Sequence, residues 1–524
     1  MKLHAFVSAK ADTSDATKVG SARWNAGHVE TLSPQYYGAV ADGATNDSTA
    51  IQAALTAGDV VFPAGSYAFK NVTIPSDRQI VFEPGAVCVP VAGCATTDEF
   101  FNAIGTSGAH LSNISIQNLR VEGSASMGRA VNCDYVDGLD IVGGSISTLG
   151  HSAIYLSNTT KFLVSGLRIE TLSGAVSGIE ALAGCAKGRI SDNHFYSMGL
   201  DAILIYGATG NITVADNYCE KFDTNASTGR GGIHAYDTQR ITIVGNTIVG
   251  TGSGATSGIR LRNASSFTVT GNHIYDAQRA AIEVVCISDP ADTYNAGRGT
   301  ISDNTVEACR RGIVYSYDVA ESETQGGTHP VTISANCIYG LVDPATGTTG
   351  ADGIAVNADY CTVQGNVVQD VPGCGIIAYG NGMSVMGNTV IDAGGGATGG
   401  TDAGFEIAGT NIRLIGNTVV ETRDPATMND AYQIAADSTG VAKDNVVVGT
   451  PLSDAVQNAG IGFIFEVSDT VPPSDVGSAW VGSKFSVGDR CWNTDPDATN
   501  ELGWYCTVGD GSDVGTWVAM STDT

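Results

Sequence analysis

The sequence predicts an all-β protein, a parallel β-helix (solenoid) with an N-terminal capping helix and a small C-terminal β module. The main observation is a repeated phrase, apolar-x-(Gly/Asp/Ala)-Asn-x-apolar, that runs from Asn193 to Asn445. Nine intervals cover 252 residues, so the mean period is 28 residues, which is typical of a solenoid. Each phrase alternates apolar and polar residues, as strands do. The repeated asparagines are Asn193, Asn217, Asn246, Asn272, Asn304, Asn336, Asn366, Asn388, Asn417 and Asn445.

These asparagines are expected to be structural, because stacked Asn side chains can bond the backbone of successive turns. Along the chain we predict four parts. Residues 1–33 are a polar, poorly patterned attachment arm, and residues 34–70 are a cap with a short helix. Residues 71–455 are the parallel β-helix, and residues 456–524 are a small β module that contains four of the five tryptophans.

The cap is predicted from a helical pattern that precedes the first repeats. Thr49 and Gln52 have the spacing of a capping box, and Ile51, Ala54 and Leu55 form one apolar helix face. The open end of a β-helix exposes apolar core and unpaired strand edges, so we expect this helix to cover that end.

Composition excludes several classes of partner. The formal net charge of −28 disfavours nucleic acids and anionic membranes, because binding phosphate needs clustered Lys and Arg. No apolar run is long enough for membrane insertion, and residues 1–10 do not have the pattern of a signal peptide. Twelve cysteines show no metal-ligand spacing, and only Cys491 and Cys506 suggest a disulfide. No Asp/Glu cluster has the spacing of a calcium loop either, so we expect no required metal, and we expect no cofactor.

A second strand lies midway between the asparagine phrases and usually begins with Gly-Ile or Ala-Ile. Strand alternation directs the isoleucine inward and the next residue outward. If the strands stack in register, the outward residues form a column that begins Tyr155, Glu180, Leu204, His234, Arg260 and Glu283. A second column, two residues further on, contains Tyr206, Tyr236 and Arg262. Loops around 219–231, 249–257, 287–299 and 317–330 are expected to wall this face into a groove for an extended polymer.

The segment Tyr37–Phe69 resembles the N-terminal cap of the pectate-lyase superfamily, in the branch shared by phage tailspikes and polygalacturonase-type glycosidases. The resemblance rests on a pattern of small, acidic and apolar residues. The matching residues are Gly38, Ala39, Asp42, Gly43, Asp47, Thr49, Ala50, Ile51, Gln52, Ala53, Pro63, Gly65 and Tyr67. It implies a right-handed β-helix in a homotrimeric tailspike that degrades a bacterial surface polysaccharide. It also implies location in the virion tail or outside the cell, with the N-terminal arm bound to other virion tail proteins.

Three successive segments are also similar to strands of the polygalacturonase family. They are Asp201-Ala-Ile, Gly231-Gly-Ile-His234 and Gly258-Ile-Arg260-Leu-Arg262. This resemblance implies that Asp201 is a catalytic carboxyl and that Arg260 and Arg262 bind sugar. The sequence departs from the family pattern at the earlier Asp, which is Ser177 here, and at the His, which is Gly231.

Glycosidases use two carboxyl groups roughly 5–9.5 Å apart, a separation that one or two stacked coils can supply. The first hypothesis is therefore an endo-glycosidase with Asp201 and Glu180 as the leading acids, His234 and Glu283 as further catalytic candidates, and Tyr155, Tyr206, Tyr236, Arg260 and Arg262 as substrate-binding residues.

Two alternatives use the same face. A polysaccharide lyase would use His234 or Tyr236 as a base beside Arg260, because proton abstraction next to a uronate needs a base and a cation. A non-catalytic receptor-binding spike would bind glycan without cleaving it. Glu283 beside Arg260 also fits a simple ion pair between coils, and His234 also fits a surface residue with no role.

Overall fold

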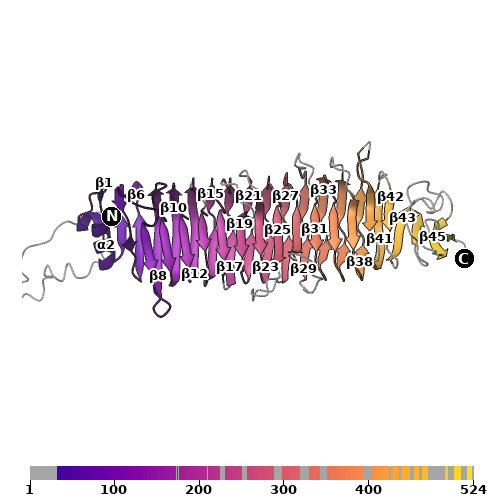
Figure 1. The fold of residues 1–524 in the computed structure, drawn as a ribbon, viewed down its shortest axis with the longest axis horizontal. Helices are drawn as coiled ribbons and strands as arrows, with labels where there is room; N and C mark the ends of the chain where they lie inside the picture. Colours follow the sequence, from indigo (N-terminus) through magenta and orange to yellow (C-terminus); the bar gives the residue numbers. More distant parts are fainter. Residues whose placement is uncertain are drawn as a thin grey trace, which may run out of the picture.

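A computed structural model describes residues 32–448 with short gaps, and beyond them the backbone of five strands. The gaps are residues 173, 175, 209, 225–229, 251–255, 288–297, 319–329, 343–350, 395–402, 424–425 and 436–437. The chain forms one long rod in which each coil stacks on the one before it (Figure 1). The predicted attachment arm, 1–33, lies almost entirely outside the described residues.

The rod begins with the 3-10 helix η1 (Pro34–Tyr37) and the α-helix α2 (Ser48–Ala57). Ile51, Ala54 and Leu55 are fully buried in the core, as the apolar face predicted. The capping-box prediction is wrong, because Asp47 occupies the N-cap and Gln52 instead bonds the backbone of Thr73 through both its amide nitrogen and its carbonyl oxygen. The described helix therefore lies at the N-terminal end of the solenoid and is tied to its first coil.

The coils that follow form two parallel sheets. The small sheet has 15 strands, and consecutive strands in the sheet come from consecutive coils. Its strands are β4 (Val72–Thr73), β7 (Phe101–Ile104), β9 (Val131–Asp134), β11 (Ile154–Ser157), β13 (Ile179–Ala181), β16 (Ile203–Tyr206), β19 (Gly231–Tyr236), β22 (Ser257–Arg262), β25 (Ile282–Ile287), β28 (Ile313–Asp318), β31 (Ile354–Asn357), β34 (Ile376–Tyr379), β37 (Ala403–Ala408), β40 (Asp430–Ile434) and β42 (Asp454–Asn458).

The large sheet begins with strands that belong to the cap and the first coils. They are β1 (Asp42–Asn46), β2 (Val60–Phe62), β3 (Gly65–Phe69), β5 (Arg78–Phe82), β6 (Ala86–Pro90), β8 (Leu111–Glu122), β10 (Val136–Ser147) and β12 (Thr160–Glu170). From β14 onward the large sheet divides into two rows that run along the rod. Figure 1 shows these rows on either side of β19, β25 and β31, which belong to the small sheet.

One row of the large sheet contains β14 (Ala186–Ser191), β17 (Gly210–Ala215), β20 (Ile241–Val244), β23 (Ser266–Thr270), β26 (Arg298–Ser302), β29 (Val331–Ser334), β32 (Thr362–Gln364), β35 (Ser384–Met386) and β38 (Ile412–Ile415). The other contains β15 (His194–Tyr196), β18 (Tyr218–Glu220), β21 (Thr247–Val249), β24 (His273–Tyr275), β27 (Thr305–Glu307), β30 (Cys337–Tyr339), β33 (Val367–Val371), β36 (Thr389–Ala393) and β39 (Thr418–Val420). The long strand β41 (Gly440–Val448) pairs with both rows.

The repeated asparagine sits between these two rows and is buried in every copy. At Asn246, for example, the side-chain amide donates to the carbonyl of Val214 at 3.0 Å and to Oδ1 of Asn272 at 2.9 Å. Its own Oδ1 accepts from the backbone and the side chain of Asn217 at 3.0 and 2.9 Å. The prediction of a structural asparagine column is confirmed.

The residue before each asparagine explains the Gly/Asp/Ala choice in the phrase. Every copy has a positive φ, between 54° and 67°, a region that glycine enters freely and that Asp enters more easily than most residues. These residues are Asp192, Asp216, Gly245, Gly271, Asp303, Ala335, Gly365, Gly387, Gly416 and Asp444. The left-handed residue turns the chain sharply from one row of the large sheet into the next.

Beyond β42 the order of the strands changes. The strand β43 (Phe463–Asp469) pairs parallel with both β41 and β44 (Arg490–Asn493). The next pairings, β44 with β45 (Glu501–Val508) and β45 with β46 (Thr516–Ser521), are antiparallel. The side chains of this region, including Cys491 and Cys506, lie outside the described residues, so the separate module at 456–524 stays a prediction, as do the other domain boundaries.

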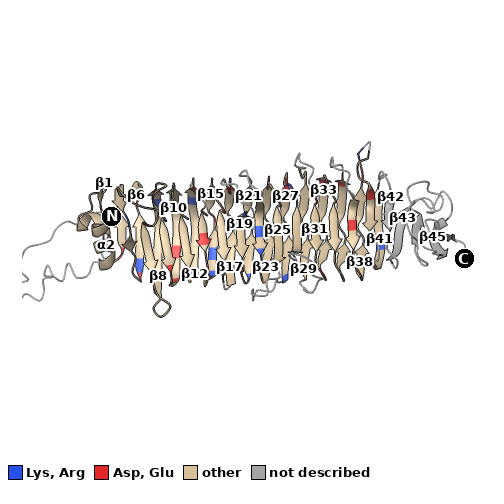
Figure 2. Ribbon diagram, viewed as in Figure 1, with Lys and Arg blue, Asp and Glu red and all other residues tan. Residues whose placement is uncertain are grey.

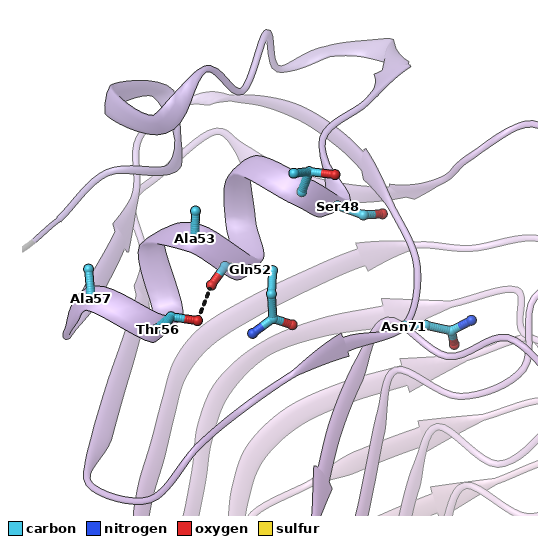
Figure 3. A pocket seen from close by; sticks show the side chains of 7 residues that line it. Ser48, Gln52, Ala53, Thr56, Ala57 and Asn71 are labelled. Atoms are coloured by element: carbon cyan, nitrogen blue, oxygen red, sulfur yellow. Dashed lines mark hydrogen bonds between the residues drawn. The ribbon is translucent and has the colours of Figure 1, made fainter.

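A hollow runs along the outer face of α2, lined by small, uncharged side chains (Figure 3). Its lining residues are Ser48, Thr49, Gln52, Ala53, Thr56, Ala57 and Asn71. The hydroxyl of Thr56 donates a hydrogen bond to the backbone carbonyl of Gln52 in the same helix, at 2.8 Å. With no acidic, basic or aromatic lining residue, this hollow has no obvious chemistry.

Candidate functional site

The predicted outward column is formed by strands of the small sheet that pair in register. Tyr155 pairs with Glu180, and Glu180 pairs with Leu204. The pairing continues from Leu204 through His234 and Arg260 to Glu283. The isoleucines that precede these residues are fully buried, which confirms that the next residue in each strand faces outward. Six side chains from six coils therefore lie in one row.

Asp201 lies two residues before Ile203, just outside the strand β16. Its side chain is fully buried. One carboxylate oxygen accepts from the backbone N–H of Gly231 at 2.9 Å, and the other accepts from Nη1 of Arg230 at 3.3 Å. These donors compensate for the loss of water around a buried charge.

His234 lies directly beside this carboxylate. Its Nδ1 is 3.4 Å from Oδ1 of Asp201, and only 7% of the residue is exposed. Neither ring nitrogen has a hydrogen-bond partner in the described part of the chain. Nδ1 therefore faces the Asp201 carboxylate without forming a well-aligned hydrogen bond, and Nε2 has no hydrogen-bond partner among the described residues, which is unusual for a buried polar atom.

Glu283 is held by two arginines and a serine. Its Oε2 accepts from Oγ of Ser257 at 2.7 Å and lies 3.2 Å from Nε of Arg260. Its Oε1 lies 2.7 Å from Nη2 of Arg279. Burial lowers the pKa of Arg260, an effect that the nearby Glu283 carboxylate opposes. Glu283 is thus the centre of an ion-pair cluster, as expected if Glu283 and Arg260 form an ion pair between coils.

Beside this cluster lies an aromatic platform. The rings of Tyr206 and Tyr236 are stacked, with centroids 5.1 Å apart and an interplanar angle of 28°. The guanidinium carbon of Arg262 lies 4.5 Å from the centroid of the Tyr236 ring. Tyr206 is 42% exposed, so the platform has a ring face available to solvent. Exposed, oriented rings of this kind are suited to binding amphipathic ligands.

The structure does not bring Glu180 into contact with Asp201. Glu180 pairs with Leu204, three residues after Asp201, which is an offset of roughly 10 Å along the strand. Glu180 is partly exposed and makes no hydrogen bond or ion pair with a described residue. Tyr155, one coil earlier, instead packs beneath Arg129, whose guanidinium carbon is 4.2 Å from the ring centroid.

Several residues of this site were not predicted from the sequence. Arg230 and Arg279 precede their strands, in connecting segments whose course the repeat does not determine. Ser257 could have been found from its place two residues before the inward isoleucine Ile259, because the predicted Asp201 has the same place relative to Ile203. Most of the predicted groove walls, residues 225–229, 251–255, 288–297 and 319–329, lie outside the described residues.

Other features of the described residues limit the chemistry. No group of three or more His, Cys, Asp or Glu side chains is arranged to hold a metal ion. No described helix has the length and apolar character needed to cross a bilayer. Acidic and basic residues are sparse along the described solenoid (Figure 2).

Comparison with solved structures gives several matches. Three matching solved structures have low sequence identity and TM-scores below 0.5. The first, ORF18 of Geobacillus virus E2, is 14% identical with a TM-score of 0.43, and the match covers 55% of this chain and 57% of that protein, less than two thirds of its length. The adhesin PfbA of Streptococcus pneumoniae is 14% identical, with a TM-score of 0.48 and coverage of 94% and 99%. The catalytic unit of an α-1,3-glucanase from Streptomyces thermodiastaticus is 17% identical, with a TM-score of 0.49 and coverage of 74% and 69%.

At these identities and TM-scores, the similarities say nothing about substrate or reaction. A search of curated proteins finds no match. Residues 171–343 match the family model described as "Right handed beta helix region", and these residues contain the candidate site from Glu180 to Glu283. Together with the in-register parallel strands, this match makes the described solenoid a right-handed parallel β-helix.

Proposed function

We propose that this protein is a tailspike-type depolymerase that binds an extended bacterial surface polysaccharide along the small sheet and cleaves its glycosidic bonds internally. The observation that carries the proposal is His234, which is buried with its Nδ1 3.4 Å from the Asp201 carboxylate and its Nε2 without a hydrogen-bond partner among the described residues. The stacked Tyr206–Tyr236 pair beside it supplies the exposed ring surface on which sugars bind.

In this proposal the acid and the base are two coils apart. Asp201 lies against His234 and orients its ring, so His234 can take a proton from the attacking water. Glu180 is partly exposed and free of ion pairs with described residues, so it can protonate the leaving oxygen. Glu180 and His234 both pair with Leu204, a separation of roughly 10 Å between backbones, which is near the wide spacing of inverting glycosidases.

Glu283 and Arg260 have a positioning role here. Both are largely buried and bonded to each other, and neither has the freedom that an acid or base needs. Arg260 pairs directly with His234, so the Glu283 cluster fixes the side chain that flanks the base.

The test is cleavage of a panel of bacterial capsular and lipopolysaccharide glycans, measured as new reducing ends. We expect His234→Ala and Glu180→Gln each to lower turnover about a hundredfold or more, the usual contribution of a general acid or base. Glu406→Gln is the matched control, because Glu406 belongs to the same outward column far from the site, where it accepts from Oη of Tyr379. Full activity of both site variants, on a glycan that the wild type cleaves, contradicts the assignment.

A polysaccharide lyase is the second candidate, favoured by the position of two arginines one coil after the base. Arg260 and Arg262 pair with His234 and Tyr236 respectively, so a uronate carboxylate could be neutralised beside a proton-abstracting histidine. A lyase product contains an unsaturated uronate that absorbs ultraviolet light, whereas a hydrolase produces only reducing ends. Binding with neither product would identify a non-catalytic spike.

The assembly belongs to the same proposal. We infer a homotrimer located in the virion tail, bound to other tail proteins through residues 1–33, with α2 acting as the lid of the solenoid. The resemblance of the cap segment and the burial of Ile51, Ala54 and Leu55 support these roles. Light scattering of the full chain tests the trimer, and a monomer would count strongly against the tailspike role.

A further inference from the structure

Polar side chains continue the outward column toward the N-terminal end of the small sheet, before the residues discussed so far. Asn102 on β7 pairs with Asn132 on β9, which pairs with Tyr155 on β11. Tyr155 in turn pairs with Glu180. We define the N-terminal patch as Glu99, Asn102, Arg129, Asn132 and Tyr155. It is continuous with the proposed catalytic face.

A buried carboxylate organises this patch. Glu99 is 9% exposed, and its two oxygens accept from Nη1 of Arg129 at 2.7 Å and from Nδ2 of Asn132 at 3.1 Å. The same Asn132 amide donates to Oδ1 of Asn102 at 3.1 Å. One hydrogen-bonded network thus joins two successive coils and fixes the orientation of both asparagines.

The network holds Arg129 flat against Tyr155. The guanidinium carbon lies 4.2 Å from the ring centroid, a cation–π distance. Burial raises the pKa of Tyr155, an effect that Arg129 opposes, so the phenol remains a hydrogen-bond donor at neutral pH. Nε of Arg129 is buried without a hydrogen-bond partner among the described residues.

The patch has more hydrogen-bonding capacity than its own structure uses. Within the described residues, the side-chain oxygen of Asn132, the amide nitrogen of Asn102 and the phenol of Tyr155 make no hydrogen bond, and all three residues are partly exposed. Donors and acceptors are therefore both available on a partly exposed surface, the combination that sugar hydroxyls require. Because Glu99 neutralises Arg129, the patch favours an uncharged sugar residue over an anionic one.

We infer that the N-terminal patch is a remote sugar-binding subsite, specific for an uncharged, hydroxyl-rich residue of the polysaccharide that the proposed function assigns to this face. Asn102 and His234 are five strands apart in the small sheet, which corresponds to roughly 24 Å. A glycan that fills this subsite must extend over several sugar residues from the bond that is cleaved. The subsite therefore makes the enzyme prefer long chains.

The experiment compares a long polysaccharide with its short oligosaccharides in wild type and in two variants. Asn132→Ala removes the central amide of the network. Arg129→Met with Glu99→Gln removes both charges together and keeps their volume, so no unpaired charge remains buried. Arg120→Ala is the control, because Arg120 is an exposed arginine of the large sheet that pairs with Glu122.

We expect the two patch variants to raise the KM for the long chain about tenfold and to leave kcat and the cleavage of short oligosaccharides unchanged. Their products should also be longer, since the chain is no longer anchored at this end. An unchanged KM in both variants overturns the subsite but leaves the depolymerase intact. A wild type that neither binds nor cleaves any glycan overturns the proposed function together with the subsite.

Discussion

The asparagine column of the large sheet and the outward column of the small sheet are built by the same stacking but differ in content. In the first, ten coils carry the same residue, and each copy bonds the next at about 3 Å. In the second, six neighbouring coils carry Tyr155, Glu180, Leu204, His234, Arg260 and Glu283.

This difference separates structural positions from functional ones. A repeated residue satisfies the same backbone groups in each coil, so its role is the same everywhere. In the outward column the residues differ from coil to coil, so they do not bond the same backbone groups. Their variety instead brings an acid, a base and cations to one place. Within a solenoid, a break in the repetition of a stacked column is thus a sign of chemistry.

The largest effect on stability is expected in the asparagine column. Asn366 is fully buried, donates to the carbonyl of Ile333 at 3.0 Å, and accepts from the backbone N–H of Asn336 at 3.0 Å. Asn366→Ala leaves these buried groups without partners, which costs on the order of 3 kcal/mol. We expect a clearly lower urea midpoint, with the activity of the folded protein unchanged.

The control is Gln364→Ala, an exposed side chain two residues away in the same coil. It should change the free energy of unfolding by less than about 0.5 kcal/mol, as surface substitutions usually do. Equal destabilisation by the two variants would remove the distinction between a structural column and an ordinary surface position.

The opposite pattern is expected at Asp201. Asp201→Asn keeps an oxygen for the N–H of Gly231 but removes the charge that faces Arg230 and His234. We expect turnover on the cleaved glycan to fall about a hundredfold, because His234 loses the partner that makes it a base. Circular dichroism should show the same fold.

Asp352→Asn is the matched control for this change. Asp352 also lies two residues before an inward isoleucine, and its Oδ1 accepts from the backbone N–H of Cys374 at 3.1 Å, as Asp201 accepts from Gly231. We expect less than about a twofold change in turnover for this control. A similar loss in both variants would mean that the position matters for the fold and not for His234.

The sequence predicted the columns because two periodicities determine them. The repeat sets which residues stack, and strand alternation sets which of them face outward, so the register from Tyr155 to Glu283 could be predicted. The same register pairs Glu180 with Leu204, three residues after Asp201, which does not fit direct contact between the two carboxylates. Arg230, which pairs with Asp201, and Arg279, which pairs with Glu283, could not be predicted, because the connecting segments that carry them follow no repeat. The capping box failed for a related reason, since Gln52 bonds Thr73, which is distant in sequence.

The smallest expected effect concerns the aromatic platform, which tests whether exposed rings on the two sheets differ in function. Tyr236→Ala removes the ring that stacks on Tyr206 and lies under Arg262. A ring contact of this kind contributes about 1 kcal/mol, so we expect the Kd for the polysaccharide to rise about fivefold to tenfold.

Tyr275→Ala is the control, because Tyr275 is 41% exposed but lies on the large sheet. Affinity electrophoresis on the intact glycan should separate the two variants, with Tyr275→Ala migrating as wild type does. The variant at Tyr236 should keep its kcat, because the platform binds the sugar and takes no part in proton transfer. An equal rise in Kd for both substitutions would show that exposed tyrosines on either sheet bind the glycan. The outward column would then not be the specific binding face.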